Sequence, residues 1–364
     1  MISKRKIILS FGVLVLLIVG MFAHKFVADY EISNQIMIES ETVDNYYNNS
    51  NVNIMPQLLK INGKLYYNYR NNPLKYGTYE ISDGVSKRIY WEGPNIFGSE
   101  NLLLDYVYDD KILAYHITDK QTVEFFNINE RKYEHYMEVE CPDGNILKDY
   151  FVIDGVMYFS TSSYTDNYNG LIYRYENGNY ELVISQDFCG EYYSITSFYK
   201  NYMYYINDVY AYDGVGNSND KLYKYDMNTK QTVDSTDISS LEFDYIYKTI
   251  AFENEVYFIL NKSDNYFMYK ISFDNNSIEK IFELDRPFVM NGYEGDIYVA
   301  VESGDKKGLY TYDSKNKKMK KFYCDQDVCE VYIVDTKWIY FTNLNYDLYR
   351  ITPDGKTLEK VFGF

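Results

Sequence analysis

Short stretches of apolar and aromatic residues recur along the chain at nearly regular intervals. The spacing between corresponding residues of successive copies lies between 41 and 53 residues. The seven copies are Leu65-Tyr66-Tyr67, Ile112-Leu113-Ala114, Met157-Tyr158-Phe159, Met203-Tyr204-Tyr205, Val256-Tyr257-Phe258, Ile297-Tyr298-Val299 and Ile339-Tyr340-Phe341. Each copy predicts one buried strand of a larger repeating unit.

Each copy is framed by turn signals and by a second strand. A polar or glycine pair such as Asn62-Gly63 or Asp154-Gly155 comes just before it, as two-residue hairpins require. After a longer gap follows a segment in which apolar and polar residues alternate, such as Leu222-Tyr223-Lys224-Tyr225. Another turn signal and a charged segment close the unit, which therefore predicts four strands in sequence.

One four-stranded meander cannot bury both of its faces, so the units are expected to stack around an axis. Seven units of this length predict an all-β fold, a seven-bladed β-propeller over residues 54–364. Six or eight blades are the alternatives, because the first unit lies beside a segment of different character. Separate β-sandwiches are disfavoured by seven meanders in phase, and helical repeats by the lack of a 3.6-residue period.

The N-terminus carries a positive flank followed by an apolar run. Lys4, Arg5 and Lys6 precede uncharged residues 7–23. This order predicts that residues 1–23 are a signal anchor, a single transmembrane helix that crosses the membrane through residues 7–23. The positive flank then stays inside, which places the propeller outside the cytoplasm at the cell membrane. Cleavage of a signal and secretion is the alternative.

Residues 24–53 are polar and show no sustained apolar period. They predict an extracytoplasmic stalk between the anchor and the propeller. The alternative is that part of this segment adds a strand to the first blade.

Amino-acid composition and net charge limit the classes of partner that we expect. The chain has 45 Tyr and 2 Trp, and tyrosine suits strands that are half buried. Its formal net charge is −17, and no basic strip lies beyond the N-terminus. Because such a surface repels phosphate groups, nucleic acid is not expected as a partner.

The last unit carries a family resemblance. It reads Trp338-Ile339-Tyr340-Phe341-Thr342-Asn343, followed by Leu348-Tyr349-Arg350-Ile351 and Asp354-Gly355. It resembles a bacterial propeller family of unknown function that is related to the YWTD propellers of low-density-lipoprotein receptors. The YWTD motif itself is absent, since the matching residues are Tyr340-Phe341-Thr342-Asn343. The resemblance implies the propeller fold and a surface location, and it implies no catalytic residues.

The four cysteines fall in connections between units. Cys324 and Cys329 are close enough in sequence to close a hairpin disulfide outside the cytoplasm. A bridge between Cys141 and Cys189 is the other pairing. The spacings do not match a zinc site, so neither a metal nor another cofactor is expected.

The longest loops within units are the best candidates for a binding site. These are the loops between the second and third strands of the third and fourth units. Strand alternation places both loops on one face of the predicted propeller, side by side in neighbouring blades. Aromatic, aspartate and asparagine side chains there suit stacking and hydrogen bonding to a sugar or a peptide. The candidate ligand-binding residues are Tyr164, Asp166, Tyr168, Tyr210, Tyr212 and Asp213.

The sequence contains no catalytic signature, and no catalytic residue is assigned. We therefore predict a non-enzymatic module that recognises an envelope protein or a glycan. The alternative is a propeller hydrolase or other carbohydrate-active enzyme, whose carboxylates converge from several blades and so escape detection in sequence. Carboxylates clustered on the loop face would favour that alternative.

Overall fold

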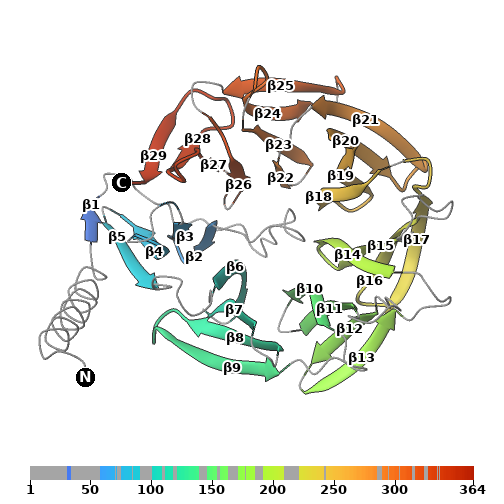
Figure 1. Cartoon of the computed structure of the whole chain (residues 1–364), viewed down its shortest axis with the longest axis horizontal. Helices are drawn as coiled ribbons and strands as arrows, with labels where there is room; N and C mark the ends of the chain where they lie inside the picture. Colours follow the sequence, from blue (N-terminus) through green and yellow to red (C-terminus); the bar gives the residue numbers. More distant parts are fainter. Residues whose placement is uncertain are drawn as a thin grey trace, which may run out of the picture.

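The computed structural model of the chain is all-β, and its antiparallel sheets form a ring, the arrangement of a β-propeller (Figure 1). The structure describes residues 31–33, 58–69, 71, 75–83, 85–90, 101–108, 111–117, 121–138, 146–153, 156–162, 171–176, 178–184, 192–208, 221–241, 243–284, 289–293, 295–302, 304–313, 316–323, 327–333, 335 and 337–364. Within these residues the strands make seven sheets, which we number 1 to 7 along the chain. No helix in the described ranges is long and apolar enough to cross a membrane, and the predicted anchor 7–23 lies outside them.

The strands of the first four sheets have the following bounds. Sheet 1 contains β1 (Glu31–Ser33), β2 (Leu58–Ile61), β3 (Lys64–Tyr69), β4 (Gly77–Ser82) and β5 (Val85–Tyr90). Sheet 2 contains β6 (Asn101–Tyr108), β7 (Lys111–Ile117), β8 (Gln121–Asn127) and β9 (Lys132–Glu138). Sheet 3 contains β10 (Ile146–Ile153), β11 (Val156–Ser162), β12 (Ile172–Glu176) and β13 (Asn179–Ile184). Sheet 4 contains β14 (Tyr192–Tyr199), β15 (Tyr202–Asp208), β16 (Lys221–Asp226) and β17 (Gln231–Asp237).

The last three sheets follow the same plan. Sheet 5 contains β18 (Tyr245–Ala251), β19 (Glu255–Lys262), β20 (Asn265–Ser272) and β21 (Ser277–Leu284). Sheet 6 contains β22 (Val289–Tyr293), β23 (Asp296–Val301), β24 (Gly308–Asp313) and β25 (Lys318–Tyr323). Sheet 7 contains β26 (Glu330–Tyr332), β27 (Ile339–Thr342), β28 (Leu348–Ile351) and β29 (Leu358–Phe362).

The four strands of each unit pair in the order of the chain, with the first strand innermost and the fourth at the rim (Figure 1). The predicted strand order within a unit is therefore confirmed. The ring has two faces. The tight turns within the inner and outer hairpins lie on one face, and the links between second and third strands lie on the other, which we call the loop face.

Sheet 1 has a fifth strand at its rim. β1, from the predicted stalk 24–53, pairs antiparallel with β5, with Glu31 opposite Lys87 and Ser33 opposite Val85. Part of the predicted stalk thus extends the first sheet, as the alternative interpretation expects. Because β1 pairs with Val85 to Lys87, that part of the edge of β5 is not open to strand pairing by another chain.

The predicted hairpin turns have the backbone that their sequences suggest. Asn62 and Gly63 both have positive φ angles, 49° and 75°, as the tight two-residue turn between β2 and β3 requires. Gly295 and Gly355, each the second residue of a predicted turn pair, have φ angles of 93° and 74°. Local turn chemistry therefore sets the register of these hairpins.

The hydrophobic core lies between neighbouring sheets, and tyrosines link the sheets. Tyr204 on β15 is fully buried, and its hydroxyl donates to the carbonyl oxygens of Phe252 and Glu253 in sheet 5, at 2.8 Å each. The Tyr67 hydroxyl of sheet 1 donates to the carbonyl oxygen of Tyr346 in sheet 7, at 2.6 Å. A tyrosine ring can fill the space between two sheets while its hydroxyl pairs with the next backbone, which explains the high tyrosine content.

A β-bulge recurs in the outer strand of every sheet. Where the third and fourth strands of each unit pair, the register shifts by one residue in the fourth strand. The extra residues are Ile89, Tyr136, Val183, Val233, Ile281, Phe322 and Val361. A bulge bends its strand and increases the local twist, so it helps the outer strand follow the rim of the ring.

The ring closes between sheets 7 and 1 without an exchanged strand, because each sheet is built from its own stretch of chain. In the described part of the two sheets, side-chain packing and side-chain hydrogen bonds join them. One cluster of buried residues spans the boundary: Leu58, Leu65, Tyr67, Tyr69, Tyr79 and Ile81 from sheet 1, with Tyr332, Trp338, Tyr340, Leu348, Val361 and Phe362 from sheet 7 and its inner turn. Phe364 at the C-terminus continues this contact, with its ring centroid 5.1 Å from that of Tyr69.

A buried ion pair crosses the same boundary. The Lys60 ammonium on β2 lies 2.9 Å from the Asp335 carboxylate, and the two side chains are only 2% and 5% exposed. Asp335 also accepts hydrogen bonds from the backbone amides of Lys337 and Trp338 and from the Tyr340 hydroxyl. Sheet 1 thus supplies the cation, and the inner turn of sheet 7 holds the anion in place.

We expect removal of either charge to destabilise the protein. Lys60→Met leaves Asp335 buried without its cation, which should lower the free energy of unfolding by roughly 3–5 kcal/mol. Asp335→Ala should lower the free energy of unfolding at least as much, because it also leaves two backbone amides and one hydroxyl without their hydrogen-bond acceptor. Thermal and urea unfolding of the full chain measure both effects.

The matched control is Glu279→Gln, which removes an exposed pair with Lys317 at the rim, with nitrogen and oxygen 3.0 Å apart. Exposed pairs contribute about 0–1 kcal/mol. A loss in Lys60→Met no larger than in this control would show that the buried pair does not secure the ring.

Candidate ligand-binding site

The residues predicted from the loops are not among those that the structure describes. Tyr164, Asp166 and Tyr168 fall between β11 and β12, and Tyr210, Tyr212 and Asp213 fall between β15 and β16. They stay a prediction. The described part of the loop face instead shows a polar cluster built from sheets 5, 6 and 7.

We call this group the Glu330 cluster; it comprises Tyr247 and Lys248 from β18, Glu302 from the β23–β24 link, and Cys329, Glu330 and Tyr332 from the start of sheet 7. Lys248 pairs with Ile259 across β18 and β19, and Glu330 pairs with Thr342 across β26 and β27. Ile259 and Thr342 hold the same position in their repeats. Lys248 and Glu330 therefore lie at the same level of two innermost strands.

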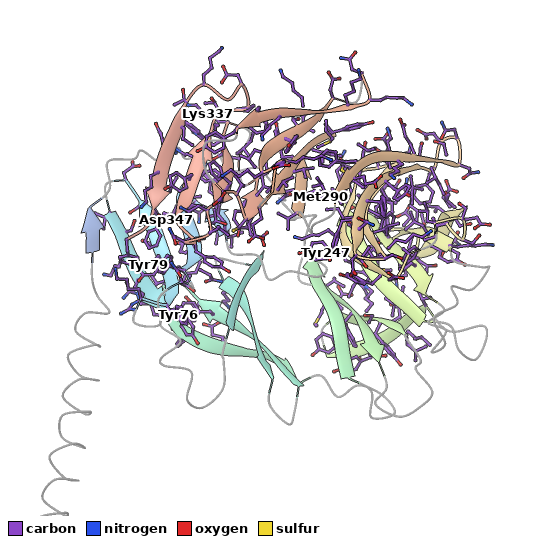
Figure 2. The ribbon with its side chains drawn as sticks, turned by 45° about the horizontal axis from the view of Figure 1, so that its top comes forward. Tyr76, Tyr79, Tyr247, Met290, Lys337 and Asp347 are labelled. Atoms are coloured by element: carbon purple, nitrogen blue, oxygen red, sulfur yellow. The ribbon has the colours of Figure 1, made fainter. Side chains whose placement is uncertain are left out.

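A bulge in β18 shapes the sheet 5 side of the cluster. Ile246 is opposite Leu260 and Lys248 is opposite Ile259, so Tyr247 is the extra residue. Bulges re-aim a side chain and are over-represented next to functional sites. Figure 2 shows Tyr247 at the inner end of sheet 5, toward the centre of the ring. Its ring packs edge-on against Tyr266, with the centroids 5.5 Å apart.

Burial and the charges of Lys248, Glu302 and Glu330 set the electrostatics of the cluster. Burial raises the pKa of Glu330 above its ordinary value; the Lys248 ammonium opposes this rise, and the Glu302 carboxylate adds to it. The pKa of Tyr247 is raised by burial and then by the charge of Glu330. Glu330 therefore lies within reach of both a positive and a negative charge, and of the two the Lys248 ammonium acts on it more strongly than the Glu302 carboxylate.

The cysteine of the cluster is held in its protonated form. Burial, followed by the charges of Glu302 and Glu330, raises the pKa of Cys329 to about 12. A thiol with such a pKa is a poor nucleophile at neutral pH. Cys329 is a free thiol in the structure, and Cys324 lies outside the described residues, so their disulfide stays a prediction.

An ion pair beside the cluster ties two sheets together. The Lys307 ammonium from the β23–β24 link lies 2.9 Å from the carboxylate of Asp327, which precedes sheet 7. In the described part of the chain, no group of three or more His, Cys, Asp or Glu residues could hold a metal ion. The polar groups of the cluster are the carboxyl groups of Glu302 and Glu330, the hydroxyls of Tyr247 and Tyr332, the Cys329 thiol and the Lys248 ammonium.

The sequence gives only a partial signal for this cluster. Alignment of the repeats marks Lys248 and Glu330 as charged residues on otherwise apolar inner strands. It does not reveal that they face a common point, because each comes from a different unit. The sequence indicates a disulfide with Cys324 as the role of Cys329. Nothing in the sequence distinguishes Glu302 from the other acidic residues.

Comparisons with known proteins agree with the fold. No protein-family model matches the chain, and no curated protein matches it in sequence. The chain is similar to a puromycin hydrolase, with a TM-score of 0.56 and 7% identity, covering 86% of this chain and 53% of that one. It is similar to a prolyl endopeptidase, with a TM-score of 0.52 and 11% identity, covering 86% of this chain and 50% of that one.

A third similar structure is the β-propeller domain of the Trilobed protease from Pyrococcus furiosus. Its TM-score is 0.48 and its identity 11%, covering 71% of this chain and 82% of that one. The chain spans about half the length of the puromycin hydrolase and of the endopeptidase. At these identities the likeness defines a class, the β-propeller proteins, and no activity.

The raised pKa of Glu330 predicts a pH-dependent stability. Its folded-state pKa exceeds the ordinary value of 4.5, so its contribution to stability is complete below that pH and is lost as the pH rises through the folded-state pKa. Glu330→Gln has no carboxyl group to ionise at this position, so the variant does not lose this contribution to stability as the pH rises. The melting temperature of the variant minus that of the wild type should therefore increase by a few degrees between pH 4.5 and pH 8, measured by circular dichroism. A difference that stays constant with pH would contradict the raised pKa.

Proposed function

We propose that the chain is a membrane-anchored, seven-bladed propeller that acts outside the cytoplasm as a non-enzymatic recognition module for an envelope protein or a glycan. The seven sheets correspond to the seven repeats of the sequence. The basic flank at Lys4, Arg5 and Lys6, followed by the apolar run 7–23, supports the anchor and its orientation. The likeness of the last unit to bacterial relatives of YWTD propellers supports membership of that group.

The observation that carries the proposal is the convergence of the Glu330 cluster on the loop face from three sheets. It combines carboxyl groups, phenol hydroxyls and an ammonium on rigid strands, as sites that orient a polar ligand do. Its thiol is protonated, because the pKa of Cys329 is about 12. Such a group of acceptors binds a ligand without the need for a nucleophile.

The test is capture of a partner from an envelope extract by the full chain in detergent. The wild type should retain a partner that Lys248→Ala and Glu330→Ala lose at least tenfold, because both variants remove charges that face the ligand. Shortening residues 209–220 tests the neighbouring predicted loop. The control is Glu279→Gln at the rim, which should capture as well as the wild type. Equal capture by all variants would move the interface away from the loop face.

A second candidate, a hydrolase, is favoured by one observation. Glu302 and Glu330 approach each other from neighbouring sheets, and Glu302 contributes to the raised pKa of Glu330. Two neighbouring carboxyl groups, one of them with a raised pKa, are what a general acid with a base or nucleophile requires.

A screen with chromogenic glycosides and peptides decides between the two functions. If the protein is a hydrolase, the wild type turns over a substrate, and Glu330→Gln lowers kcat by 10²-fold or more. Under the recognition proposal neither protein shows turnover, while the wild type still captures its partner. Turnover lost in Glu330→Gln would replace our proposal with the hydrolase.

A further inference from the structure

We propose that the Glu330 cluster binds a primary ammonium group, such as the side chain of a lysine on the recognised partner. This inference rests on the proposed recognition function and adds the chemistry of the ligand. It is carried by two buried hydroxyl groups that share a face of sheet 7 with Glu330.

The first hydroxyl belongs to Thr342. Thr342 is fully buried and lies directly opposite Glu330 in the pairing of β26 with β27, so the two side chains share one face of the sheet. Its Oγ1 has no hydrogen-bond partner among the described residues. Buried hydroxyls are nearly always paired, so one that is not requires an explanation, of which a bound polar group is one.

The second hydroxyl belongs to Tyr332, two residues beyond Glu330 on β26 and therefore on the same face. Tyr332 is only 4% exposed, and its hydroxyl likewise has no partner in the part of the chain that the structure describes. Burial and then the charge of Glu330 raise the pKa of Tyr332, which places its hydroxyl within the field of that carboxyl. Two buried hydroxyls without a hydrogen-bond partner among the described residues thus share one face of the sheet with the Glu330 carboxyl group.

The charges and the hydrogen-bonding groups of the site favour an ammonium ligand. An ammonium has three donors and no acceptor, and it matches a carboxylate and two hydroxyl oxygens that can accept. Glu302 and Glu330 carry two negative charges when ionised against the single charge of Lys248, so a second cation completes the balance. An anionic ligand would face both carboxylates, and a neutral sugar hydroxyl would leave their repulsion in place.

The exposure of the two carboxyl groups and the negative net charge of the molecule both favour an ammonium ligand. Glu330 is partly exposed and Glu302 is exposed at the loop face, so an ammonium on a flexible side chain can reach the carboxyl groups from outside. The formal net charge of −17 draws positively charged partners toward the molecule. Thr342 lies opposite Glu330 and Tyr332 two residues further along β26, and their hydroxyl oxygens would accept hydrogen bonds from the ammonium.

Binding should depend on pH in a defined direction. The titratable and charged groups around Glu330 are Tyr247 and Lys248 from β18, Glu302 from the β23–β24 link, Asp327 paired with Lys307, Cys329, and Tyr332. Of these, Glu330 is the carboxyl group whose pKa is raised above its ordinary value of 4.5, mainly by burial. An ammonium ligand requires the ionised form of Glu330, and its affinity should therefore rise with pH.

The experiment uses the full chain in detergent and fluorescein-labelled tetralysine as the probe, with fluorescence anisotropy as the readout. Wild-type protein should bind tetralysine at least tenfold more tightly than the same peptide with acetylated side chains. Affinity should rise between pH 4.5 and pH 7.5. Glu330→Gln should weaken binding at pH 7.5 at least tenfold and abolish the pH dependence.

Two variants separate binding from folding. Tyr332→Phe and Thr342→Val remove hydroxyls that make no internal hydrogen bond, so the melting temperature should stay within about two degrees of the wild type. Each should nevertheless weaken tetralysine binding at least threefold. The control Glu279→Gln removes one acidic charge at the rim and should bind as the wild type does, which excludes attraction to the acidic surface in general.

Equal losses in Glu330→Gln and Glu279→Gln would overturn the inference, and so would equal binding of the acetylated peptide. Failure of the recognition function would look different. If tetralysine binds through Glu330 and the envelope extract yields no partner, the ammonium site stands and recognition falls. If a partner is captured through the loop face with its lysines acetylated, recognition stands and the ammonium site falls.

Discussion

A ring of sheets is stable only if its last sheet is fixed to its first, and here that joint contains no shared strand. Leu58, Tyr67 and Phe362 pack across it, and the ion pair of Lys60 with Asp335 is buried within it. The loop-face site depends on the same joint, because β26 belongs to sheet 7 and carries both Glu330 and Tyr332. A buried ion pair is sensitive to the position of both partners, so it fixes the two sheets in one relative placement as well as holding them together.

The fold could be predicted from the sequence because the information for it is local. A strand such as Met203-Tyr204-Tyr205 and a turn such as Asn62-Gly63 each specify their own hairpin, and repetition at a constant period specifies the ring. The outer bulges escaped prediction, although consecutive apolar residues such as Ile281 and Phe282 interrupt the alternation there. The strand β1 was anticipated only as an alternative, because three residues show too little periodicity to predict a strand.

The candidate site could not be predicted in the same way. Its members come from three sheets, and residues far apart in sequence meet only once the ring has closed. Tyr332 and Thr342 look like ordinary strand residues in the sequence, and their proposed role rests on buried hydroxyls that have no hydrogen-bond partner among the residues the structure describes. The long loops attracted attention because aromatic and acidic residues are concentrated there, but such concentration indicates exposure as readily as binding.

Under the proposed membrane anchoring, the pairing of β1 with β5 determines how a pull on residues 7–23 reaches the propeller. In the proposed orientation, the seven residues 24–30 between the anchor and β1 span at most about 25 Å, which keeps the rim of sheet 1 near the bilayer. Tension along this tether acts first on the three residue pairs of β1, at the edge of the sheet. Only after β1 has separated from β5 does the load pass along the chain to β2 and its Lys60. Under the proposed anchoring, β1 therefore separates from β5 before the contacts that close the ring between sheets 7 and 1 come under load.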